Sequence, residues 1–157
     1  MSHTRHLLSA LALSLCATSP ALAATEFRGG GFLTSFSGCG GWGSRESVLV
    51  RYQPAGAPEN HATRSRVSMF HHSGAFNYSF DFAPGDYPEL GEWFAVSTTK
   101  VFGSGYTIDG VSLRLLESSP VEAIAAGATT IFLAFEVSNF DGLTGCTARG
   151  RVALALD

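Results

Sequence analysis

The sequence predicts an all-β fold of about eight short antiparallel strands that form a small sandwich or a closed barrel. Three observations lead to this prediction. Apolar and polar residues alternate with a period of two, most clearly over residues 76–82. Glycine, proline and aspartate separate the alternating stretches at short intervals. Outside the N-terminal segment, no long stretch has the three- and four-residue apolar spacing of an amphipathic helix.

Residues 1–23 are predicted to be a secretory signal peptide that is cleaved off. A short, partly basic start precedes an apolar run from Leu7 to Ala17, and Ala21 and Ala23 supply the small residues of a cleavage site. The run is shorter than the roughly 20 residues that a membrane-spanning helix needs. We therefore expect residues 24–157 to form a single domain that is periplasmic or secreted, without membrane insertion after cleavage.

The charge of the chain argues against one class of partner. The formal net charge is −3 at pH 7, and the sequence contains no basic run. Proteins that bind nucleic acid usually carry a basic patch or stripe. We therefore expect no nucleic-acid partner.

The first part of the domain is predicted to contain two strands joined by a tight connection. The first covers residues 26–36, where three glycines at 29–31 suggest a bulge or a close backbone approach. Four glycines surround one cysteine and one tryptophan over residues 38–43, which indicates the connection. The second strand covers residues 47–52, and prolines end it at 54–58.

Residues 67–82 are predicted to form a hairpin whose turn is Ser73-Gly74. In its second strand the aromatic residues share one face and the polar residues share the other. His71 would then lie on the apolar face and His72 on the polar face, because adjacent strand residues point to opposite sides. The predicted cross-strand pairs are Met69 with Tyr78, Val67 with Phe80, Ser68 with Ser79 and Arg66 with Asp81.

The second half continues the pattern of short strands. A change of apolar parity at Asp109-Gly110 predicts a bulge or a turn inside one of them. The predicted elements are an irregular loop at 83–92, strands at 93–102 and 106–117, one helical turn within 120–127, and strands at 130–140 and 146–156.

Two of the three cysteines are predicted to form a disulfide. Cys16 lies in the signal segment, so Cys39 and Cys146 remain in a chain that we expect to be exported. Free buried thiols and a metal-binding pair are the alternatives. Closing so long a loop stabilises a fold by about 4–5 kcal/mol in the chain-entropy model. The bond would also suit first and last strands that lie side by side, as when a sheet closes on itself, and a sandwich linked across two sheets is the alternative.

A catalytic or metal site has weak support in the sequence. The histidines of the domain are His61, His71 and His72. The carboxylates that could act together with them are Asp86 and Glu89 in the irregular loop. Neighbouring histidines on one strand point apart, so they do not share a metal easily. We expect no metal and no cofactor, and keep a metal-binding protein or a hydrolytic enzyme that uses these residues as the alternative.

Four aromatic residues in or beside glycine-rich loops are the candidate ligand-binding residues: Trp42, Tyr87, Trp93 and Tyr106. Exposed loop aromatics are what binding modules use for sugars or partner proteins, although they can also plug the ends of a β fold. The sequence therefore predicts a non-catalytic binding or inhibitory module whose partner is a protein or a small molecule.

Overall fold

The computed structural model describes residues 26–54, 64–71, 74–81, 89–101, 105–120 and 128–157, apart from the side chains of Phe80 and Asp81. The predicted signal peptide lies outside these residues, as does nearly all of the helical turn expected within 120–127. In the described part, almost every segment is a strand, and one short 3-10 turn (Phe140–Gly142) is the sole helical element. The all-β prediction is confirmed.

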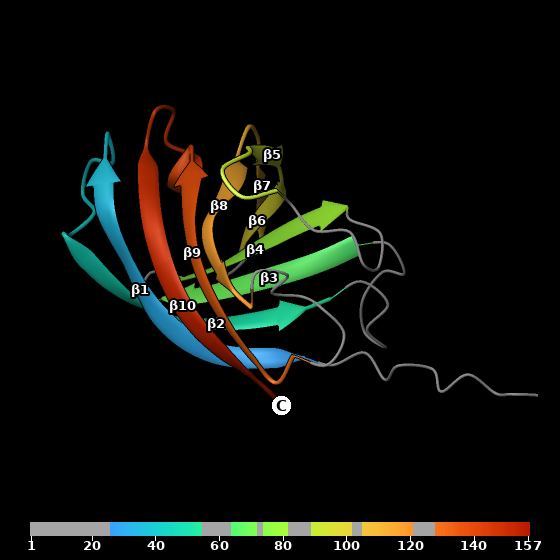
Figure 1. Cartoon of the computed structure of the whole chain (residues 1–157). Coiled ribbons are helices and arrows are strands. Elements are labelled where there is room, and N and C mark those ends of the chain that lie inside the picture. The colour runs from blue at the N-terminus through green and yellow to red at the C-terminus, as the bar shows by residue number, and fades with distance from the viewer. Residues whose placement is uncertain (1–25, 55–63, 72–73, 82–88, 102–104, 121–127) are drawn as a thin grey trace, which may run out of the picture.

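The described residues contain ten strands (Figure 1). Their bounds are β1 (Phe27–Ser37), β2 (Arg45–Gln53), β3 (Arg64–His71), β4 (Gly74–Asp81), β5 (Phe94–Ala95), β6 (Ser97–Val101), β7 (Tyr106–Ile108), β8 (Ser112–Ser119), β9 (Thr130–Ser138) and β10 (Thr147–Leu156).

All ten strands belong to one antiparallel sheet that curls round an interior. Its order is β5-β8-β9-β10-β1-β2-β3-β4-β6-β7. The two ends of this order, β5 and β7, belong to one hairpin. In its first arm β5 continues through Val96 into β6, and in its second arm β7 continues through 109–111 into β8. The parity change predicted at Asp109-Gly110 is the break between β7 and β8. Figure 1 shows β1, β10 and β9 curving round the interior, so the fold is barrel-like.

Small residues allow the close approach of β1 to β10, the first and last strands. A Cβ atom at Gly29 would collide with the backbone carbonyl of Ala153, and one at Gly31 would collide with that of Arg151. The close approach predicted from these glycines is therefore confirmed. The irregularity of β1 comes later, between Thr34 and Ser37, where the register with β10 shifts.

The hairpin of β3 and β4 forms, but the predicted register is wrong by two residues. Residues 72 and 73 connect the strands, so His71 rather than His72 is the last paired residue of β3. A slip of two residues keeps every side chain on its predicted face, so the face pattern alone could not detect it. The observed pairs are Met69 with Phe76, Val67 with Tyr78, Ser68 with Asn77, Arg66 with Ser79 and Arg64 with Asp81.

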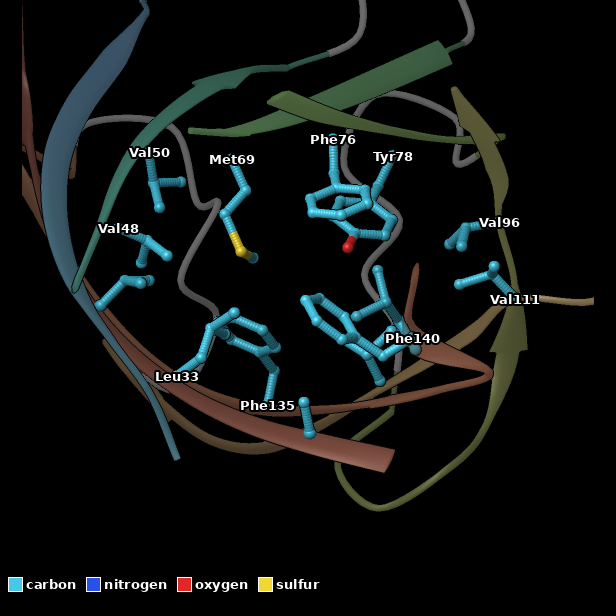
Figure 2. Close-up of a cluster of buried hydrophobic side chains, with 14 of the residues drawn as sticks. Leu33, Val48, Val50, Met69, Phe76, Tyr78, Val96, Val111, Phe135 and Phe140 are labelled. Carbon is cyan, nitrogen blue, oxygen red and sulfur yellow. The ribbon is translucent and has the colours of Figure 1, made fainter. Parts of the chain in front are cut away.

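The inward faces of the strands form one hydrophobic core (Figure 2). Phe76, Phe140 and Leu33 are fully buried within it. The predicted disulfide between Cys39 and Cys146 is present, with 4.6 Å between the Cα atoms. It joins the connection after β1 to the residue before β10, which are neighbouring strands, as the sequence predicted.

Candidate functional site

A cavity of about 60 Å³ lies inside the barrel. Its walls come from strands on all sides of the sheet, because inward-facing residues of distant strands meet there. Every lining residue is aliphatic, aromatic or a methionine: Val50, Tyr52, Val67, Met69, Tyr78, Phe94, Leu113, Leu115, Ile131, Leu133, Phe135, Val152 and Leu154. A space walled in this way stays dry and favours apolar ligands.

Part of the cavity wall is less deeply buried than the rest. Val67, Phe94, Leu115 and Leu133 are partly buried, whereas Val50 on the same lining is 4% exposed. These four residues come from four different strands, β3, β5, β8 and β9.

The other end of the barrel is closed by stacked rings, which we call the aromatic plug: Phe36, Trp42, His71, Phe76 and Phe140. Trp42 packs edge-on against Phe140 at 4.8 Å and against His71 at 5.0 Å between ring centroids. His71 stacks on Phe76 at 5.0 Å, and Phe36 stacks on Trp42 at 5.4 Å. None of the five lines the cavity, so the plug seals the barrel above it.

An ion pair locks the β9–β10 connection to the wall beside the plug. Lys100 on β6 pairs with Asp141, and their side chains are 13% and 18% exposed. Asn139 holds the same connection, because its amide donates to the carbonyl of Gly110 at 2.7 Å and its side-chain oxygen accepts from Gly145 N–H at 3.0 Å. The connection that carries Asp141 is therefore fixed from several sides.

Tyr78 lies between the plug and the cavity. Its ring is 6.2 Å from that of Phe76, and it also lines the cavity. Burial raises the pKa of the Tyr78 phenol well above its usual range, and the nearby Asp141 carboxylate raises it further. The phenol therefore stays neutral at any physiological pH and does not supply a charge to the interior.

The four predicted ligand-binding aromatics do not gather at one place. Trp42 belongs to the aromatic plug, while Trp93 is 42% exposed and lies 4.7 Å from the guanidinium of Arg114. Tyr106 is 51% exposed on β7, where it pairs with Lys100. Tyr87 lies outside the described residues. Their role in binding stays a prediction.

The residues of the alternative catalytic or metal site are placed only in part. His61, His72 and Asp86 lie outside the described residues, and Glu89 is exposed. His71 is partly buried and packs in the aromatic plug. Across the part of the chain that the structure describes, no three His, Cys, Asp or Glu side chains gather closely enough to hold a metal ion.

Comparison with known proteins gives no family for this chain. No family model, no curated protein and no solved structure matches it. Within the described ranges, no helix is long and apolar enough to cross a membrane.

Proposed function

We propose that this protein is a non-catalytic binding protein whose barrel interior holds a small apolar ligand or one end of an alkyl chain. The cavity carries the proposal, because thirteen apolar or aromatic side chains surround it. Protein interiors are normally packed without voids larger than a water molecule. A cavity retained at the centre of the barrel fits a binding role.

The size and chemistry of the cavity define the ligand class. Engineered apolar cavities of about 150 Å³ hold benzene, so the 60 Å³ measured here suits only a few non-hydrogen atoms. Among the residues that the structure describes, the lining includes no acidic, basic or amide side chain. A ligand that carried a polar group into the cavity would lose hydrogen bonds to water without replacement. The inserted part of the ligand is therefore hydrocarbon.

The test compares 1-hexanol with 1,6-hexanediol, each added to the protein at increasing concentration. Hexanol can insert its methyl end and leave its hydroxyl in water, whereas either end of the diol would bury a hydroxyl. Ligands that bind the folded state raise the melting temperature. We expect hexanol to raise it relative to the diol at equal concentration. Equal melting temperatures throughout both titrations would contradict the proposal.

A further inference from the structure

The outer face of the barrel carries a continuous row of apolar and small residues, which we call the outer stripe. It runs across neighbouring strands at matching register positions, so each member lies directly beside the next. From β9 to β4 the outer stripe comprises Phe132, Ala153, Gly30, Leu49, Phe70 and Ala75.

The large members of the outer stripe are exposed to solvent. Leu49 is 69% exposed, Phe70 is 44% exposed and Phe132 is 38% exposed. Phe32 lies two residues after Gly30 on β1, on the same outward face, and is 40% exposed. Scattered exposed apolar residues are ordinary on protein surfaces, but a contiguous row of them marks an interaction site.

Arginine surrounds the outer stripe. All eight arginines of the described residues lie on the outward faces of the strands: Arg28, Arg45, Arg51, Arg64, Arg66, Arg114, Arg149 and Arg151. The acidic side chains described on this face are Glu26, Glu117, Glu136 and Asp157. Arginines therefore outnumber carboxylates on this face, even when Asp81, which pairs with Arg64 in the register of β3 and β4, is counted, although the whole chain carries −3.

Ion pairs neutralise part of this positive charge, since Arg28 also pairs with Asp157 at 3.2 Å, and another arginine lies over an exposed ring. Glu26 is shared by Arg28 and Arg51, with nitrogen-to-oxygen distances of 2.6 and 2.5 Å. The guanidinium of Arg45 lies 3.6 Å from the centre of the Phe32 ring. Arginine placed beside exposed aromatic and aliphatic groups can reach anionic groups while its stem covers apolar surface.

The shape of this face selects the kind of partner. The wall that contains β1, β9 and β10 is curved (Figure 1). The outer stripe faces away from the core and therefore lies on the convex side of this wall, where a flat rigid surface would touch few strands at once. A shallow hollow of about 410 Å³ adjoins the stripe, with Phe132 and Ala153 in its lining and Arg28 at its polar side. The partner that fits this face is a deformable surface with negative charge on the outside and hydrocarbon beneath it. Such a surface can follow the convex shape of the wall and attract its arginines.

We propose that the outer stripe and its surrounding arginines rest on an anionic lipid surface. Leu49, Phe70 and Phe32 would enter the boundary between headgroups and acyl chains, and the arginines would contact the headgroup phosphates. Interfacial binding of this kind combines buried apolar area with attraction to anionic lipids. The inference is independent of the interior cavity.

The experiment measures flotation of the protein with vesicles of phosphatidylglycerol and with vesicles of phosphatidylcholine. We expect binding to phosphatidylglycerol that weakens as salt is added, because the arginines supply part of the attraction. The double variant Leu49→Gln/Phe70→Gln should bind these vesicles at least roughly tenfold more weakly. The control Leu143→Gln changes an apolar residue that is 38% exposed in the β9–β10 connection, away from the outer stripe, and should bind as the wild type does.

Three results would overturn the inference. The first is equal binding to neutral and anionic vesicles, and the second is unchanged binding by the double variant. The third is a dimer in sedimentation velocity that the double variant abolishes, because the outer stripe would then be covered by a second copy. Thermal melts of the variants confirm that each is folded, since exposed substitutions cost little stability.

Discussion

The two ends of the barrel are built differently. At one end the aromatic plug, the disulfide and the Lys100–Asp141 ion pair hold the β1–β2 and β9–β10 connections against the wall. Away from that end, the cavity is lined partly by half-buried residues, among them Val67 and Leu133. The plug end is therefore held by ring packing, a disulfide and a largely buried ion pair, whereas the described wall of the cavity includes partly buried apolar residues.

The difference between the ends should appear most strongly when large aromatic residues are removed. Phe140 is fully buried in the plug, so Phe140→Ala should lower the free energy of unfolding by about 3–5 kcal/mol. Phe94 lines the cavity and is partly buried, so Phe94→Ala should cost clearly less. Denaturant unfolding of both variants measures the contrast. Equal losses would mean that the two ends are packed equally well.

A second comparison concerns ion pairs. Asp141→Asn keeps the shape of the side chain and suits the left-handed backbone at this position (φ 55°), but it leaves Lys100 largely buried without its counter-ion. We expect a loss of about 1–3 kcal/mol, below the 3–5 kcal/mol typical of a fully buried pair. The control Glu117→Gln affects an exposed pair with Arg151, separated by 3.7 Å, and should cost under about 0.5 kcal/mol. Chemical unfolding of the two variants should separate them clearly, and similar values would show that Asp141 does not lock the plug end.

The buried phenol of Tyr78 predicts a smaller effect that depends on pH. Its pKa is raised in the folded state, so above about pH 10 the unfolded chain loses a proton that the folded chain keeps. The free energy of unfolding should then fall by about 1.4 kcal/mol for each further pH unit, while below pH 10 this contribution stays constant. Tyr78→Phe should lose less stability than the wild type between about pH 9 and pH 11. An identical fall in both proteins would contradict the assignment.

The sequence predicts the fold better than it predicts the site, for a physical reason. Strand parity places Phe76 and Tyr78 in the core because a period of two follows directly from the pleat. The same period cannot separate registers that differ by two residues, so the pairing of Arg66 with Asp81 was predicted wrongly. The position of the turn determines the register, and the preference of Ser-Gly for turns did not identify that position.

The cavity left no recognisable pattern in the sequence. Val50 and Val48 are both inward-facing residues of β2, and both are nearly fully buried, yet only Val50 lines the cavity. The difference depends on the volumes of side chains from distant strands, such as Phe135 and Leu154, that meet in the interior. Trp42 could be recognised as a candidate only because glycines surround it, and the same glycines allow it to fold into the plug.

Val50 and Val48 also provide the most direct test of the central claim. Val50→Ile adds one methylene to the cavity wall, whereas Val48→Ile adds it to packed core. One displaced methylene is worth about 0.8 kcal/mol, so Val50→Ile should weaken hexanol binding roughly fourfold, without loss of stability. Val48→Ile should leave hexanol affinity unchanged and cost about 1 kcal/mol through overpacking. Hexanol affinity that is the same in wild type and Val50→Ile would show that the cavity is not the binding site.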